Sequence, residues 1–456
     1  MRVLLTLLLA GTTGTAPVQA TPLPWQPCGE HGAECATLQV PMDWSRPDRG
    51  RITLALSRLK AADPTRRVGV LFFNPGGPGG PARPMLRDYA TTAFPAALRE
   101  RFDIVGVDPR GVGESTPAIT CEEPTRGPDQ FPGTREGYQR LADYNRRVGE
   151  GCARATGPLI DHVDTPSAAR DFDAVRKALG ERRVSWLGLS YGTLLATTYA
   201  RMYPERVRAA VLDGPLDHTV GSRRMALDEA RETEEAFTRF ADWCRTDTTC
   251  AMHGKDVGTA YRELLARARR HPVPAQGHPA GVTAPQIGHN AYNMLSFPAT
   301  GWAQLARGIR DATATPPNAA EFATEVSSDA AYRTIACHDF PSDVRGHRDL
   351  ASRQREIRKA APTTGGYVEG WDIQAGCLGW PIRPANPWGP TPVRGAPSVL
   401  IVGSTTDPAT PEVWGRGLAR QIKGSKLLIW KGVGHTAYFN DSPTRSREVA
   451  HLVNAR

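Results

Sequence analysis

The stretch that decides the fold is "WLGLSYGTLLA", Trp186–Ala196, in which one serine stands between two glycines. An apolar run of strand length precedes this serine, and a helical pattern, "YGTLLATTYARMY", follows it. So tight a turn from strand to helix strains the backbone of the serine, and the residues two positions away must be small, as Gly188 and Gly192 are. The turn would expose Ser190 at the carboxyl edge of a parallel sheet, where such sheets bind ligands. The setting favours a nucleophilic Ser190 over a serine in a structural turn.

Apolar runs of strand length recur along the rest of the chain and alternate with helical patterns. One helix is predicted to begin at Thr165, as its cap, with Pro166 in the first position and Gly180 at its end. Alternating strands and helices indicate an α/β fold, a mostly parallel sheet with helices on both faces. The strands are expected at residues 52–59, 68–73, 104–107, 184–188, 207–212, 399–402 and 427–430.

A long insertion separates the last two predicted strands from the others. About 185 residues lie between Leu212 and Val399, which is far more than an ordinary loop holds. They contain helical patterns, including Met225–Cys244, and end in a proline-rich connector. We therefore predict a large inserted, mainly helical cap at residues 217–392, between two parts of the core at residues 21–216 and 393–456.

A serine hydroxyl needs a base to take its proton and an acid to orient that base. When the serine lies on such a turn, the chain order is serine, acid, histidine. Asp407 follows a strand in "VLIVGSTTDPATP", and His435 follows the last strand in "GVGH". Asp213, at the end of the strand after the serine helix, is an alternative acid. Asp407 is preferred because the acid usually comes from the later strand.

A glycine- and proline-rich loop, "NPGGPGGP" at Asn74–Pro81, also follows a predicted strand. Its glycines let backbone amides approach a substrate, and its prolines stiffen the loop. The amides of Gly77 and Tyr191 are the expected donors to the negative oxygen that forms when a carbonyl is attacked. The loop lacks the GK[ST] sequence of a phosphate-binding loop.

Composition excludes several classes of function. The net charge of +9 comes from arginines scattered along the chain, whereas a nucleic-acid site needs a basic stripe with interleaved aromatics.

Residues 1–20 have the plan of a secretory signal peptide, with cleavage expected after Ala20, and no later stretch resembles a membrane anchor. The sequence makes no prediction of oligomeric state.

Eight cysteines fit an oxidising compartment, and no metal-ligand spacing occurs among them. Structural disulfides are therefore expected rather than a zinc site. Eight cysteines allow about 105 pairings. Pairing of sequence neighbours is our hypothesis because short loops close easily: Cys28 with Cys35, Cys121 with Cys152, Cys244 with Cys250, and Cys337 with Cys377.

Six segments together resemble a known family: "NPGGPGG", "DPRGVGES", "GLSYGTLLATTYA", "VLDGPLDH", "STTDPATP" and "GVGHTAY". They are similar to the secreted tripeptidyl aminopeptidases of the proline iminopeptidase-related α/β-hydrolases, and the match covers nearly the whole mature chain. The resemblance implies an α/β-hydrolase fold, a triad of Ser190, Asp407 and His435, and an oxyanion hole of Gly77 and Tyr191. It also implies cleavage from a free N-terminus, with the cap setting peptide length. Pro81 departs from the serine or alanine that relatives often carry there.

An aminopeptidase must hold the α-ammonium group of its peptide substrate, which calls for a carboxylate in a partly dry pocket. Asp339, beside Cys337, is the preferred candidate in the cap. The other candidates are Glu234, Glu235, Glu321 and Glu325. We expect a secreted serine exopeptidase that needs no cofactor or metal and takes peptides with free N-termini. The alternatives are an esterase, an amidase or a proline iminopeptidase-like hydrolase that uses the same triad on a small-molecule substrate, and a binding protein on a hydrolase scaffold.

Overall fold

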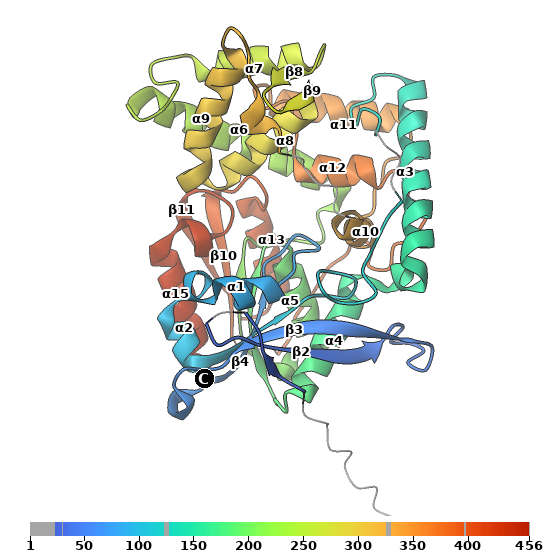
Figure 1. Ribbon diagram of the computed structural model, residues 1–456, viewed down its shortest axis with the longest axis vertical. Helices are drawn as coiled ribbons and strands as arrows, with labels where there is room; N and C mark the ends of the chain where they lie inside the picture. Colours follow the sequence, from blue (N-terminus) through green and yellow to red (C-terminus); the bar gives the residue numbers. More distant parts are fainter. Residues whose placement is uncertain (1–22, 30, 123–126, 325–329, 396–397, 456) are drawn as a thin grey trace, which may run out of the picture.

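A nine-stranded sheet forms the centre of the lower half of the molecule in Figure 1, a computed structural model. The structure describes residues 23–29, 31–122, 127–324, 330–395 and 398–455. The strands lie in the order β1-β2-β3-β5-β4-β6-β7-β10-β11. Their bounds in chain order are β1 Gln26–Pro27, β2 Glu34–Pro41, β3 Arg51–Leu59, β4 Gly69–Asn74, β5 Phe102–Val107, β6 Val184–Leu189, β7 Val207–Asp213, β10 Val399–Thr406 and β11 Lys426–Val433.

The strands from β5 to β11 pair in parallel, and β1, β2 and β3 add an antiparallel edge. Successive side chains of a strand point to opposite faces. In β4, Phe72 packs into the core on one face of the sheet and Phe73 into the core on the other. Both faces are therefore buried, which explains why these strands are continuous apolar runs rather than alternating ones.

Helices cover both faces of the sheet, so the predicted α/β class is confirmed. Helices α4 (Thr165–Ala178), α5 (Tyr191–Met202) and α13 (Glu412–Gln421) contribute to the core that contains Phe72. Helices α1 (Arg83–Ala93), α2 (Ala96–Arg101), α14 (Ala437–Asn440) and α15 (Ser442–Asn454) contribute to the opposite core. The predicted strands and the helix of the serine motif are all present, with ends shifted by a few residues.

The residues between β7 and β10 lie above the carboxyl edge of the sheet in Figure 1 and have a core of their own. They form α6 Gly221–Thr246, α7 Val257–Ala268, β8 Val273–Ala275, β9 His278–Val282, α8 Ala284–Ser296, α9 Pro298–Thr313, α10 Ala330–Asp339, α11 His347–Ala360 and α12 Glu369–Gly376. We keep the name cap for residues 217–392, whose boundaries as a domain remain a prediction.

The cap also contacts a helix that the sequence analysis did not single out. Helix α3 (Arg135–Thr156) runs beside the cap on the right of Figure 1. The side-chain amide of Asn145 donates to the carbonyls of Ala375, 2.7 Å away, and Leu378, 2.8 Å away. Phe131, just before α3, stacks on Trp371 with ring centroids 4.7 Å apart. Residues outside 217–392 thus help to hold the cap in place.

One expected helix cap is wrong. Asp164, not Thr165, caps α4, because its carboxylate accepts a hydrogen bond from the backbone N–H of Ser167 at 2.9 Å. Thr165 is the first helical residue, and its hydroxyl contacts Asp339 instead. A carboxylate at this position also interacts favourably with the helix dipole, so the aspartate displaces its neighbour.

The four neighbouring cysteine pairs are bonded as hypothesised. The bond between Cys337 and Cys377 ties α10 to the end of α12 within the cap. The predicted signal peptide lies outside the described residues. Among the helices that are described, none combines the length and the apolar character needed to cross a membrane.

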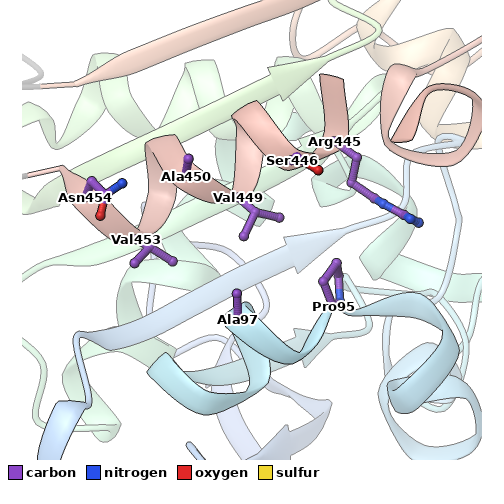
Figure 2. A pocket seen from close by; sticks show the side chains of 8 residues that line it. All are labelled: Pro95, Ala97, Arg445, Ser446, Val449, Ala450, Val453 and Asn454. Carbon is purple, nitrogen blue, oxygen red and sulfur yellow. The ribbon is translucent and has the colours of Figure 1, made fainter. Parts of the chain in front are cut away.

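A groove of about 400 Å³ lies between α2 and α15, on the side of the sheet away from α5, and Figure 2 shows the side chains that line it. Pro95 and Ala97 line one wall and residues of α15 line the other. Ser190, Asp407 and His435 do not line this groove, so it belongs to a different part of the surface from the predicted site.

Candidate active site

Ser190 lies at the turn from β6 to α5 in a backbone conformation that ordinary residues rarely adopt, with φ 54° and ψ −126°. Its N–H donates to the carbonyl of Asp213 at 2.8 Å, which ties the turn to the end of β7. A Cβ added to Gly188 would lie 2.4 Å from the carbonyl oxygen of Gly192, so neither glycine position has room for a side chain. The strain and the close packing are those expected of a nucleophile on a sharp turn.

The loop that begins at Asn74 packs directly against this turn. A Cβ on Gly76 would lie 2.8 Å from Cβ of Ser190, and one on Gly192 would lie 2.8 Å from Oδ1 of Asn74. The N–H of Gly76 donates to that same Oδ1 at 3.1 Å. Gly76 therefore lets the loop approach Ser190 closely, and its own amide is already hydrogen-bonded to Asn74. The next amide, that of Gly77, stays the predicted oxyanion donor together with that of Tyr191.

His435 lies just after β11, and an aspartate and a threonine hold its ring. Its Nδ1 is 3.1 Å from both carboxylate oxygens of Asp407 and 3.2 Å from Oγ1 of Thr410. Thr410 also donates to Asp407 at 2.8 Å. The backbone N–H of His435 donates to the carbonyl of Ser296 in α8 at 2.7 Å. This arrangement leaves Nε2 as the ring nitrogen available for a proton transfer.

The surroundings of His435 raise its pKa. Burial, the largest single effect, lowers the pKa of this imidazole, but the neighbouring carboxylates together raise it, and Asp407 contributes most of that increase through its charge and its hydrogen bond. Glu369 and Asp213 add smaller effects in the same direction. A histidine with a raised pKa is a stronger base toward a serine hydroxyl.

Asp213, the alternative acid, has a different set of partners. Its carboxylate accepts hydrogen bonds from the backbone N–H groups of Ala437 at 3.0 Å and Tyr438 at 2.8 Å. Complete burial raises its pKa to about 7. The side chain that meets the His435 ring is thus Asp407, while Asp213 holds the segment immediately after that histidine.

The carboxylates that were predicted to hold a substrate amine and lie in the described part of the chain are already engaged with other residues of the protein. Asp339 accepts hydrogen bonds from the backbone and hydroxyl of Thr165, from Tyr191 and from Asn386. Asp339 is fully buried and fixes the Tyr191 side chain, which favours a positioning role for it. Among the other candidates, Glu234 accepts backbone hydrogen bonds from Thr363 and Thr364, Glu235 pairs with Arg239, Glu321 pairs with Arg307, and Glu325 lies outside the described residues.

Two other cap carboxylates, which the sequence analysis missed, act electrostatically on the predicted triad, Glu369 on His435 and Glu229 on Asp407. Glu369, at the start of α12, accepts hydrogen bonds from the hydroxyls of Tyr332 and of Tyr292, the latter at 3.4 Å. Glu229, on α6, accepts the N–H of Gly370 at 2.6 Å through Oε2. Its Oε1 is buried and has no hydrogen-bond partner among the described residues. Burial raises the pKa of both carboxyls. The charge of Glu369 raises the pKa of Glu229 further, whereas the charge of His435 acts to lower the pKa of Glu369.

No sequence motif could have found this pair. Glu229 and Glu369 come together because α12 packs against α6, where a Cβ on Gly370 would lie 2.9 Å from the backbone nitrogen of Ala226. Thr410 could have been found, because it follows Asp407 by three residues in the same loop. Among the described residues, no group of three His, Cys, Asp or Glu side chains is placed to hold a metal ion.

Comparison with known proteins identifies the family of this chain. Residues 69–280 match the family described as "alpha/beta hydrolase fold", and residues 366–455 match "TAP-like protein". The chain is 30% identical over 474 residues to the serine protease Hip1 of Mycobacterium tuberculosis, covering 96% of this chain and 90% of that one. The chain belongs to the tripeptidyl aminopeptidase-like α/β hydrolases.

Two further relatives show the range of activities named within these hydrolases. The tripeptidyl aminopeptidase of Streptomyces coelicolor is 29% identical over 430 residues, covering 88% of this chain and 77% of the relative. Carboxylesterase B of Mycobacterium tuberculosis is 32% identical over 480 residues, covering 97% and 89%. The chain is therefore an enzyme, a serine hydrolase. Its peptidase relatives support a serine peptidase, and the esterase relative keeps the choice of substrate open.

Proposed function

We propose that this protein is a secreted serine exopeptidase that releases short peptides, tripeptides in particular, from free N-termini. Oγ of Ser190 attacks the peptide carbonyl carbon while Nε2 of His435 takes the hydroxyl proton. Asp407 holds the imidazolium through Nδ1, and the amides of Gly77 and Tyr191 stabilise the oxyanion. The C–N bond then breaks, and His435 gives its proton to the leaving amine. Water, deprotonated by His435, releases the acyl peptide from Ser190.

The observation that carries the peptidase proposal is the buried pair Glu229 and Glu369, whose charges act on each other and, through Glu369, on His435. Oε1 of Glu229 is buried without a hydrogen-bond partner among the described residues, which costs free energy while no ligand is bound. A ligand that brings a cation to this oxygen would therefore bind well. The α-ammonium group of a peptide is such a cation. An esterase acting on an uncharged substrate would have no use for two carboxyls at this place.

The position of this pair also limits the length of the released peptide. Helix α8 contacts His435 through Ser296 and contacts Glu369 through Tyr292, one turn earlier. A helix rises 1.5 Å per residue, so the two contacts are about 6 Å apart along α8. An extended peptide spans about 3.3–3.6 Å per residue, so this separation corresponds to about two residues and an amine held at Glu369 fits a short acyl part. The name of the Streptomyces relative favours three.

Secretion is supported by the signal-peptide pattern of residues 1–20 and by the four disulfides, which persist in oxidising compartments. Cleavage after Ala20 would leave a mature chain that begins shortly before β1. Analysis of the N-terminus of the protein purified from a culture medium tests this part of the proposal.

A panel of p-nitroanilides of one, two and three alanines tests the substrate. Each is offered with a free and with an acetylated N-terminus, beside p-nitrophenyl acetate, to the mature protein and to the Ser190→Ala variant. We expect release of p-nitroaniline from the free-amine tripeptide and none from its acetylated form. Hydrolysis of the ester with every peptide untouched would overturn the peptidase proposal and favour the esterase, which the 32% identity to carboxylesterase B supports.

A further inference from the structure

A cavity of about 1010 Å³ lies between the cap and the segment 127–131 that precedes α3, next to the proposed amine site. Its lining includes Tyr332 and Asp372, together with residues from α7, α8 and α11. The hydroxyl of Tyr332 donates to Glu369, and its backbone nitrogen would lie 3.0 Å from a Cβ on Gly79 in the predicted oxyanion loop. Tyr332 therefore links the cavity to both ends of the site. A substrate whose amine binds at Glu369 has its first side chains beside this cavity.

Two arginines stack on aromatic rings in the wall of the cavity. The guanidinium carbon of Arg358 lies 5.5 Å from the ring centroid of Phe131, and that of Arg269 lies 5.9 Å from the ring of Tyr367. The two rings contact each other, with centroids 5.1 Å apart. All four residues line the cavity. The Nε–H of Arg269 also donates to the hydroxyl of Tyr367 at 3.4 Å, and the other N–H groups at the edges of the two guanidiniums remain to meet a carboxylate.

Carboxylates of the protein do not occupy these edges. Within the part of the chain that the structure describes, neither Arg269 nor Arg358 pairs with an aspartate or glutamate. Asp372 forms an ion pair with His289, and Asp129 accepts the N–H of Phe131 at 2.9 Å. The remaining cationic side chains of the wall are Arg270 and Arg333, and Arg333 donates to Asn145 and to the carbonyl of Gly376. The wall thus carries more positive than negative charge.

We propose that Arg269 and Arg358 form a subsite that binds the acidic side chain of a peptide substrate at its first or second residue. This inference rests on the proposed exopeptidase function and adds a preference to it. The guanidinium of an arginine presents parallel N–H groups that match a carboxylate, which an uncharged amide of the same shape cannot exploit. The subsite therefore selects aspartate or glutamate over asparagine or glutamine near the N-terminus of the peptide.

Matched pairs of tripeptide p-nitroanilides test this preference. Glu-Ala-Ala is compared with Gln-Ala-Ala, and Ala-Glu-Ala with Ala-Gln-Ala, all with free amines. We expect kcat/KM to favour glutamate over glutamine at least tenfold in one of the two pairs. In the double variant Arg269→Gln, Arg358→Gln the ratio should fall to near one. The double variant to lysine should keep part of it, because the charge remains and the planar fork is lost.

A control variant separates the subsite from the overall charge of the cap. Arg262 on α7 and Arg355 on α11 are exposed, as Arg269, just after α7, and Arg358 on α11 are, but they do not line the cavity. The double variant Arg262→Gln, Arg355→Gln removes the same charge and should keep the wild-type ratio. Circular dichroism and thermal unfolding report whether each variant is folded.

The possible outcomes distinguish failure of the acidic subsite from failure of the exopeptidase proposal. Cleavage of all four peptides by the wild type with both ratios near one would overturn the acidic subsite and leave the exopeptidase standing. A high ratio that survives in the glutamine variant, or that falls equally in the control variant, would also overturn the subsite. Cleavage of the ester without cleavage of any peptide would overturn the function and the subsite together.

Discussion

Asp407 holds the ring of His435 through both of its carboxylate oxygens, each 3.1 Å from Nδ1. Asp213, one strand away, instead binds the backbone of the residues that follow His435. We therefore expect Asp407→Asn to lower kcat about 10⁴-fold, because an amide at this position stabilises the wrong tautomer. Asp213→Asn keeps the triad contacts and should lower kcat much less while lowering thermal stability. Equal losses of kcat in the two folded variants would contradict this assignment of the acid.

The pH dependence of activity follows from the raised pKa of His435. The imidazole must be neutral to take the serine proton, so activity is lost as the pH falls through its pKa. Because Asp407 raises that pKa, the acid limb of kcat/KM should have its midpoint above the ordinary value of 6.5. A free-amine peptide should show an alkaline limb as well, near the α-amino pKa of about 8, because its ammonium form binds the carboxyls.

An ester without an amine provides the control for this pH profile. It should show the acid limb alone, since only the enzyme titrates in that range. An acid limb centred below 6.5, or an alkaline limb of equal size with the ester, would contradict the expected profile.

The proposed amine site predicts how a glutamate variant behaves. Glu369→Gln should lower kcat/KM for the free-amine tripeptide about 10–100-fold, because a hydrogen bond to a charged group contributes about 1.5–3 kcal/mol. The loss with p-nitrophenyl acetate should be far smaller. Glu235→Gln, which changes a cap glutamate paired with Arg239 on α6, serves as the control and should match the wild type with both substrates. Equal losses with peptide and ester would show that Glu369 acts on the triad and not on the amine.

The parts of the site that were predictable are those that a short stretch of chain determines. Ser190 and the strand before it could be predicted because the turn demands small residues at fixed positions and the buried strand demands an apolar run. The sequence predicts Thr165 as the cap of α4, but Asp164 directly before it is also a capping residue type, and only the structure shows that Asp164 bonds the helix. Glu229 and Glu369 are 140 positions apart, as their numbers show, and meet only through the packing of α6 on α12.

The contact between Gly76 and Ser190 predicts a strong effect from one methyl group. Gly76 has φ +105°, and a Cβ there would lie 2.7 Å from the carbonyl oxygen of Leu189 as well as against Ser190. Gly76→Ala should lower kcat at least about 100-fold, the loss typical of a displaced oxyanion donor. Gly157→Ala is the matched control, because Gly157 has φ +72° but nothing within 4 Å of an added Cβ. It should cost some stability and no activity, and a similar loss of kcat in both variants would refute the steric argument.

The buried carboxyl of Glu448 on α15 should make the stability of the protein depend on pH. Neither of its oxygens has a hydrogen-bond partner among the described residues, and burial raises its pKa well above 4.5. A carboxyl group whose pKa is higher in the folded than in the unfolded state favours folding below the unfolded pKa, and this advantage is lost as the pH rises through the folded pKa. Glu448→Gln removes the titration, so it should match the wild type near pH 4.5 and be more stable by about 1–3 kcal/mol at pH 8. Denaturant unfolding at both pH values measures the difference, with Glu263→Gln on the exposed side of α7 as the control. A gain of equal size at the two pH values would mean that the side chain acts through packing and not through its charge.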